Sequence, residues 1–239
     1  MSIPKIVHQT YVTSDLPSPT RNIIIQMKRQ NPDFKFVLYD DQAMGLFMKN
    51  NFHGRVYDCF TRLNMGAAKA DLWRYCVLYK IGGVYLDIDS HITGSLNNLI
   101  TNNEEAIISR EKNMGSFLQW MLIYPPKHEI MKKTIDLCCE RIEERLDNIL
   151  EVTGPGVYTS AINEVIAPHI SFKTNNLWHV PDKRINAETT DADFPVRCRF
   201  FGKDYGEYGK FKYKGFGELY DEWGEGIVHW SKNKNFYKY

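Results

Sequence analysis

The sequence predicts an α/β fold in which helices flank a mixed, mostly parallel β-sheet. Strand-like and helix-like segments alternate within the first 50 residues, which is typical of βαβ units. A long apolar, helix-like stretch then ends at two glycines and leads directly into another strand-like run. The 239 residues contain no internal repeat and no clear linker, and 43% of them are hydrophobic, so we predict one domain over residues 1–239.

The first half of the chain supplies the alternating elements. Asn31-Pro32 ends the first helix, because the residue before a proline disfavours helical backbone. Gly82-Gly83 ends the third helix, because glycine readily adopts the left-handed conformation that closes helices. In chain order, the predicted elements are a strand at 5–10, a helix at 18–33, a strand at 34–41, a helix at 42–52, a helix at 64–83 and a strand at 84–90.

The second half begins with extended segments and continues with helices. The apolar residues of segment 127–150 recur near helical spacing, which predicts one amphipathic helix. The predicted elements are extended segments at 106–109 and 116–123, the helix at 127–150, a turn at 153–156 that opens a helix at 158–166, short strands after residue 176 and a mobile loop region at 202–226.

Charge and cysteine content exclude several classes of protein. A net charge of +1 offers no basic footprint, so we expect no nucleic-acid partner. The sequence has no apolar run of about 18 residues and does not begin like a secretory signal, so we expect no transmembrane segment and no secretion. Five cysteines without a CxxC pair argue against a disulfide framework and a zinc knuckle, and they favour a reducing, cytoplasmic location.

Two carboxylates, Asp87 and Asp89, stand one residue apart in the run GGVYLDIDS. Residues i and i+2 of a strand face the same side, so we expect both carboxylates to point together, away from Leu86 and Ile88. Carboxylates this close repel each other unless a cation lies beside them, and hard oxygen ligands suit Mn²⁺ or Mg²⁺. The alternative is an ordinary solvated strand end with two surface acids.

A second charged pair, Asp71 and Arg74, lies on the preceding helix. Residues three apart share a face of a helix, and the neighbours of this pair are apolar, so we expect both side chains to be buried. A buried ion pair can be purely structural, because desolvation opposes the Coulomb attraction. We favour a functional role for the pair at the edge of a pocket.

The segment KADLWRYCVLYKIGGVYLDIDS resembles the DXD sugar-binding region of glycosyltransferases of the Och1-like mannosyltransferase and α-1,4-galactosyltransferase family. It is also similar to the catalytic domain of the clostridial glucosylating toxins. The residues that match the family pattern are Ala70, Asp71, Arg74, Leu78, Gly82, Gly83, Tyr85, Asp87 and Asp89. IPKIVHQTY at 3–11 and TGPGVYT at 153–159 resemble two further family segments, so the resemblance covers most of residues 3–160.

The resemblance implies a GT-A fold with a Rossmann-like nucleotide-binding part at about 1–110 and an acceptor part at about 111–239. It implies a retaining enzyme that uses Mn²⁺ or Mg²⁺ to move a hexose from a UDP- or GDP-linked sugar to a glycan acceptor. There are three alternatives. The first is a nucleotide-sugar-binding protein or hydrolase without acceptor transfer, and the second is a protein-modifying glucosyltransferase. The third is a structural module in which the DXD is accidental. A bacterial or viral enzyme of polysaccharide biosynthesis in the cytosol is our hypothesis for its setting.

Roles for individual residues also follow from the resemblance. It implies that Asp71 and Arg74 contact the donor sugar, that Asp87 contacts ribose or sugar and helps to order the metal, and that Asp89 binds the metal directly; these four are the candidate catalytic residues. His229 would complete the metal shell; the alternative is a surface histidine. The candidate donor-binding residues are Val7, His8, Gln9, Tyr11, Asp71, Arg74, Tyr85, Asp87, Trp230 and Lys232. No catalytic base is expected, because the departing phosphate can take the acceptor's proton.

Overall fold

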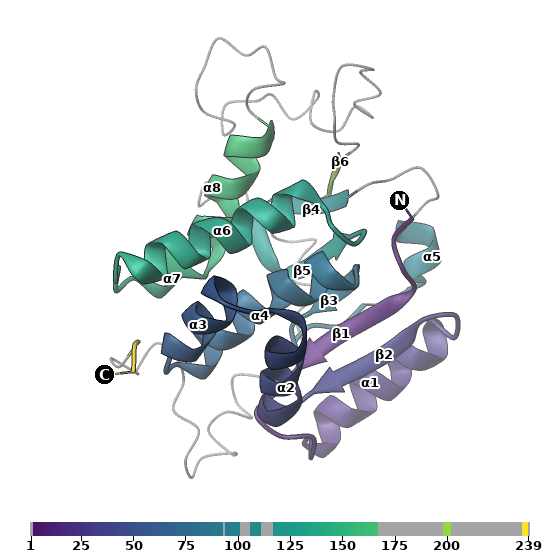
Figure 1. The fold of residues 1–239 in the computed structure, drawn as a ribbon. Coiled ribbons are helices and arrows are strands. Elements are labelled where there is room, and N and C mark those ends of the chain that lie inside the picture. The colour runs from purple at the N-terminus through teal and green to yellow at the C-terminus, as the bar shows by residue number, and fades with distance from the viewer. Residues whose placement is uncertain are drawn as a thin grey trace.

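Six strands in the described part of the chain form one mixed sheet with helices on both faces (Figure 1). The structure is a computed structural model that describes residues 2–92, 94–100, 106–110, 117–166, 198–201 and 236–238. In chain order the elements are β1 (Ile6–Thr10), α1 (Ser18–Gln30), β2 (Lys35–Tyr39), α2 (Asp41–Asn51), α3 (Arg55–Arg62), α4 (Gly66–Lys80), β3 (Gly83–Leu86), α5 (Leu96–Leu99), β4 (Ala106–Arg110), β5 (Phe117–Tyr124), α6 (Glu129–Glu143), α7 (Ile149–Val152), α8 (Pro155–Ile166) and β6 (Cys198–Phe201).

The strand order across the sheet is β2-β1-β3-β5-β4-β6. Strand β1 pairs in parallel with β2 and β3, and β4 pairs in parallel with β6. Strand β5 pairs antiparallel with both of its neighbours, so it is the one strand of these six that runs against the others. The predicted α/β class with a mixed, mostly parallel sheet is therefore confirmed.

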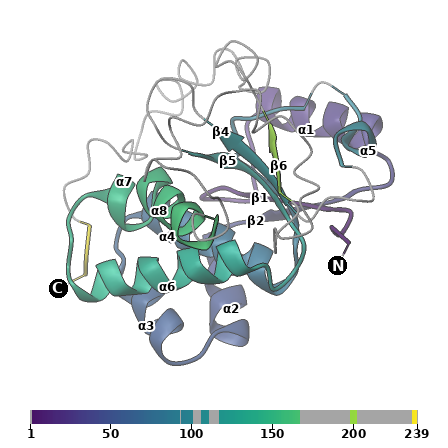
Figure 2. The same ribbon diagram turned by 90° about the horizontal axis from the view of Figure 1, so that it is seen from above.

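The two faces of the sheet carry separate apolar clusters (Figure 2). Helices α1 and α5 cover one face, and α4, α6 and α8 cover the other. Val84 and Tyr85 are neighbours in β3, yet Val84 packs in the α1-side cluster and Tyr85 in the α4-side cluster. Of the helices that the structure describes, none combines the length and the apolar surface needed to cross a bilayer.

The two glycines after α4 set where β3 begins. Gly82 and Gly83 have φ angles of +74° and +107°, which side chains with a Cβ rarely adopt. A Cβ on Gly83 would lie 2.5 Å from the carbonyl oxygen of Ile6, and one on Gly82 would lie 2.6 Å from the nitrogen of Pro126. Only glycine permits this close approach of backbones, which brings β3 beside β1 immediately after α4 ends.

The single helix predicted for 127–150 is wrong. Helix α6 ends at Glu143, Arg145 adopts a φ of 58°, and the short helix α7 begins after Asn148, whose side chain accepts a hydrogen bond from the N–H of Leu150 at 3.1 Å. Leu146 lies in the break and is 42% exposed, so its apolar character did not indicate a buried helix face. Helices α3 and α5 were not predicted.

Two buried histidines make the stability of this fold depend on pH. Nε2–H of His8 donates to the carbonyl oxygen of Gly82 at 3.0 Å, and Nδ1 of His128 accepts from the N–H of Ile130 at 3.2 Å at the start of α6. Burial lowers the pKa of each histidine from 6.5 to about 4, although for His8 the bond to Gly82 opposes the change. Between pH 6.5 and 4 the unfolded chain therefore binds more protons than the folded chain. We expect each histidine to lower the free energy of unfolding by up to about 3 kcal/mol over this range, measured by urea denaturation.

A His128→Asn variant separates this effect from the titration of carboxylates. Asparagine retains a side-chain acceptor at the helix start but carries no titrating group. We expect the variant to lose less stability than the unsubstituted protein when the pH falls from 7 to 4. Identical losses in the two proteins would contradict the assignment.

Candidate functional site

Asp87 and Asp89 lie in a turn that follows β3, and not inside the strand. Strand β3 ends at Leu86, and the N–H of Ser90 donates to the carbonyl oxygen of Asp87 at 3.0 Å, which closes the turn. The prediction that strand alternation aligns the two carboxylates is therefore wrong, and Ile88 between them is half-buried against the α1-side cluster. Both aspartates are partly exposed at the carboxyl end of β3, an edge where ligands of α/β sheets bind.

Arg74 connects helix α4 to this turn. Its Nη2 lies 2.7 Å from Oδ1 of Asp71, and its Nη1 lies 3.3 Å from Oδ1 of Asp87. The guanidinium lies over the ring of Tyr85 at 4.6 Å, and the Tyr85 hydroxyl donates to the same Asp87 oxygen at 2.8 Å. The side chains of Asp71 and Arg74 are each 8% exposed, so the predicted burial of the pair is confirmed. The side chain of Asp87 is 27% exposed. The three charged side chains, called here the Asp71–Arg74–Asp87 chain, therefore lead from the interior to the turn.

Asp71 is held by two further donors. Nε2 of Gln119 donates to its Oδ1 at 3.1 Å, and the hydroxyl of Thr153 donates to its Oδ2 at 3.1 Å. Burial raises the pKa of Asp71 to about 7, against the opposing charge of Arg74. Burial acts to lower the pKa of Arg74. Tyr85 and the carboxylates of Asp71 and Asp87 outweigh this effect, so the pKa of Arg74 is raised.

The sequence indicated only part of this arrangement. Thr153 was recognised as the start of a turn and not as a partner of Asp71. Gln119 was not identified as a partner of Asp71, because it lies 48 residues along the chain from it. The signal that could have found it is a lone glutamine in an apolar strand.

The carboxylates of the turn fit a divalent cation. Asp87 and Asp89 both lie in the partly exposed turn, and carboxylate oxygens are the hard ligands that Mg²⁺ and Mn²⁺ prefer. In the described ranges, no group of three or more His, Cys, Asp or Glu side chains comes together to hold a metal. Two aspartates nevertheless suffice for Mg²⁺ or Mn²⁺, because such ions are commonly bound by one or two carboxylates together with phosphate oxygens and water.

Several predicted residues lie outside the described residues. These are His229, the predicted third metal ligand, with Trp230 and Lys232 of the donor-binding set and the loop region at 202–226. Their roles stay predictions. Of the short strands expected after residue 176, the structure describes β6.

The donor-binding residues predicted on β1 lie apart from Arg74. Val7 and Gln9 are buried on the α1 side of the sheet, and His8 is buried on the α4 side. Tyr11 directly follows β1, where its N–H donates to the carbonyl oxygen of Tyr39 at 3.1 Å, and its ring is partly buried. The structure thus brings Asp71, Arg74, Tyr85 and Asp87 together, and of the four β1-segment residues it places Tyr11 at the carboxyl edge.

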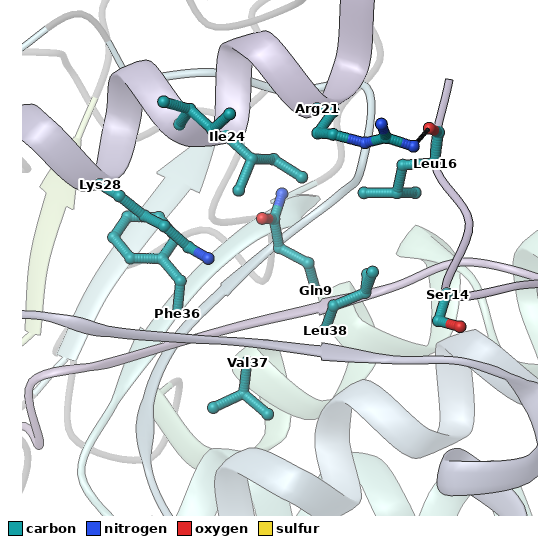
Figure 3. Close-up of a pocket in the computed structure, with 10 residues that line it drawn as sticks. Gln9, Ser14, Leu16, Arg21, Ile24, Lys28, Phe36, Val37 and Leu38 are labelled. Atoms are coloured by element: carbon teal, nitrogen blue, oxygen red, sulfur yellow. Dashed lines mark hydrogen bonds between the residues drawn. The ribbon is translucent and has the colours of Figure 1, made fainter. Parts of the chain in front are cut away.

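A cavity of about 160 Å³ lies between α1 and the strands β1 and β2 (Figure 3). The residues that line it are Gln9, Ser14, Leu16, Arg21, Ile24, Ile25, Lys28, Phe36, Val37 and Leu38. The Gln9 side chain extends toward Ile24 between the helix and the strands (Figure 3). Within the described part of the chain, Nε2 of Gln9 is buried and has no hydrogen-bond partner.

A Gln9→Met variant should stabilise the protein by about 1 kcal/mol, because a buried donor without a partner is costly and methionine fills a similar volume. Urea denaturation measures the change, with Gln26→Met on the exposed face of α1 as the matched control. Lower stability in Gln9→Met alone would show that the amide is satisfied in solution. Nucleotide-sugar affinity in the same variant tests the donor-binding role predicted for Gln9.

Comparisons with known proteins show which families and folds this chain resembles. Residues 17–106 match the family model described as "Glycosyltransferase sugar-binding region containing DXD motif". Inositol phosphoceramide mannosyltransferase 3 of Schizosaccharomyces pombe is 33% identical over 101 residues, which cover 41% of this chain and 28% of that protein. Uncharacterized glycosyltransferase L373 of Acanthamoeba polyphaga mimivirus is 26% identical over 165 residues, which cover 68% of this chain and 65% of that protein.

The fold has a counterpart among solved structures. The structure titled "PaToxG Glycosyltransferase" superposes with a TM-score of 0.59 over 71% of each chain at 20% identity, which shows a shared fold. The match spans only 28% of the length of inositol phosphoceramide mannosyltransferase 3. The activities in the names of these relatives are therefore stated of those proteins and not of this chain. The resemblance predicted from the motif is confirmed, because residues 17–106 of this chain match the model of a glycosyltransferase sugar-binding region that contains the DXD motif.

Proposed function

We propose that this protein is a metal-dependent, retaining glycosyltransferase that moves a hexose from a UDP- or GDP-linked sugar to a glycan acceptor. The observation that carries the proposal is the Asp71–Arg74–Asp87 chain, which ends at the partly exposed DXD turn within the matched sugar-binding region. Mannosyltransferase is the activity in the name of one relative, which supports mannose as the first hexose to test.

The chemistry requires charge to be stabilised on a departing diphosphate. A divalent ion held by Asp87 and Asp89 would supply a Lewis acid for that charge. Arg74 offers a planar guanidinium, fixed by Asp71 and Asp87, whose hydrogen-bond geometry a lysine would not reproduce. The Tyr85 hydroxyl fixes the orientation of the Asp87 carboxylate by donating to it. The acceptor hydroxyl would attack the donor sugar from the face that the phosphate leaves. The departing phosphate can then take the proton of that hydroxyl, so the protein need not supply a base.

A screen of nucleotide sugars tests the proposal. A bound donor stabilises the folded state, so we expect one donor, with Mn²⁺ present, to raise the melting temperature. Removal of the metal with a chelator should abolish the shift. If no donor shifts melting, the transferase proposal fails, and metal-independent binding would indicate that the DXD turn does not bind a cation.

Turnover assays separate transfer from the alternatives. We expect release of the nucleoside diphosphate to accelerate when a glycan acceptor is added, with the acceptor's mass increased by one hexose. Release at the same rate with and without acceptor would indicate a hydrolase. Transfer to a protein and to no glycan would indicate a protein-modifying enzyme.

We also propose that the protein works in a reducing compartment such as the cytoplasm. Four cysteines, Cys59, Cys76, Cys138 and Cys139, are free and buried, which supports the proposal. Thiol titration of the unfolded protein, purified without reductant, should find every cysteine reduced. A disulfide in that material would contradict the proposal.

A further inference from the structure

Strand β5 runs past the end of β3 and lies along the DXD turn. The two strands pair antiparallel, with Leu86 of β3 opposite Met121 of β5. Strand β3 ends at Leu86, but β5 begins at Phe117, so residues 117–120 lie beyond the paired end of β3. The N–H of Asp87 donates to the carbonyl oxygen of Trp120 at 2.8 Å, which ties the first residue of the turn to β5.

The next residue of β5 in the direction of the turn, Gln119, contacts both members of the buried ion pair. Its backbone carbonyl oxygen accepts from Nη1 of Arg74 at 3.0 Å. Its side-chain Nε2 donates to Oδ1 of Asp71 at 3.1 Å. Two consecutive residues of β5 thus contact this arrangement: Gln119 binds the side chains of Asp71 and Arg74, and Trp120 binds the backbone N–H of Asp87.

The amide of Gln119 is itself held in place. The Tyr75 hydroxyl donates to Oε1 of Gln119, and the same hydroxyl lies 3.0 Å from the carbonyl oxygen of Thr153. Because Oε1 accepts from Tyr75, Nε2 must face Asp71. The amide offers an acceptor on one side and a donor on the other, whereas a carboxylate cannot donate when ionised and an apolar side chain does neither.

We propose that Gln119 is a positioning residue of the donor-sugar site, acting through Asp71 and Arg74. This inference rests on the proposed function and adds to it a residue outside the segment 17–106 that matches the family model. Gln119 keeps the Asp71 carboxylate in one orientation, and that carboxylate together with the Gln119 carbonyl fixes the guanidinium of Arg74. The sugar is thereby oriented, while the diphosphate and its metal depend on the turn at Asp87 and Asp89.

A Gln119→Met variant tests the inference, because methionine has a similar volume but cannot donate to Asp71. We expect kcat for transfer to fall roughly 10- to 100-fold, as for other residues that orient a ligating side chain. Affinity for the free nucleoside diphosphate with Mn²⁺ should stay within about twofold, since the turn and its link to Trp120 remain. Gln42→Met, the same change at an exposed position on α2, is the matched control and should leave kcat unchanged.

Two further variants make the test specific. In a protein that already carries Asp71→Asn, adding Gln119→Met should lower kcat by less than about twofold. The effect of Gln119 passes through Asp71, so it is largely lost once the carboxylate is gone. Gln119→Glu retains an acceptor for Tyr75 but places a second carboxylate against Asp71, so we expect a larger loss than with methionine.

The outcomes distinguish this inference from the proposed function. Absence of turnover in the unsubstituted protein with every donor overturns the proposed function and this inference with it. Normal kcat in folded Gln119→Met, or equal weakening of diphosphate binding and kcat, overturns the inference alone. Failure of both Gln119 variants to fold also overturns it, because Gln119 would then be a requirement of the fold.

Discussion

Asp89→Asn should lower kcat about 10²- to 10³-fold while the protein stays folded. Asp89 is partly exposed in the turn after β3, and an amide of the same size as its carboxylate fits there, so we expect the fold to be retained. If Asp89 is a metal ligand, an amide in its place removes the charge that attracts the cation and weakens the neutralisation of the leaving diphosphate. Transfer assays over a range of Mn²⁺ concentrations measure both effects.

The control for this variant is Asp58→Asn, an equal change of charge at an exposed position of α3. We expect it to have unchanged kcat and unchanged Mn²⁺ dependence. Melting temperature and far-UV circular dichroism should match among the three proteins. Undiminished turnover in Asp89→Asn would remove the metal-binding role of the turn and with it the chemistry proposed here.

Arg74→Met should lower the free energy of unfolding by about 3–5 kcal/mol, because it leaves a buried carboxylate without its cation. Asp71 is 8% exposed at its side chain, and its remaining donors, Gln119 and Thr153, carry no charge. Arg74 also contacts Asp87 and the ring of Tyr85, so we expect donor binding to be lost as well. Urea denaturation measures the stability, and thermal shift with a donor measures the binding.

The loss in Arg74→Met should itself depend on pH. Burial already raises the pKa of Asp71 to about 7, and removal of Arg74 raises it further, because the charge of Arg74 opposes the effect of burial. The folded variant therefore holds a proton on Asp71 that the unfolded chain releases near pH 4. The loss of unfolding free energy caused by Arg74→Met should consequently be larger at pH 8 than at pH 5.

A double-mutant cycle provides the control. Asp71→Asn removes the carboxylate that Arg74→Met leaves unpaired, so the double variant should lose less stability than the sum of the two single changes. Additive losses, or a loss in Arg74→Met that does not change between pH 5 and pH 8, would show that the pair does not act as a coupled buried unit.

Most of the secondary structure was predictable because it depends on neighbours in the sequence. The Gly82-Gly83 pair ends α4 through backbone conformations that other residues rarely adopt, and this preference is readable from residue type alone. Prediction failed at 144–148, where Arg145 and Asn148 break the apolar pattern by backbone conformation and capping. Asp87 and Asp89 are readable in the sequence as a DXD segment, but the turn that contains them follows from the end of β3 at Leu86 beside β5.

The sequence by itself determined the α/β class, the shared helix face of Asp71 and Arg74 and the presence of the DXD segment, because each depends on residues a few positions apart. The tertiary structure decided what surrounds those groups. Gln119 and Thr153 meet Asp71 across 48 and 82 positions of the chain, and Arg74 reaches Asp87 only because α4 packs beside β3. Such contacts depend on how the sheet and its helices pack, and packing joins residues whose separation in the sequence carries no local pattern.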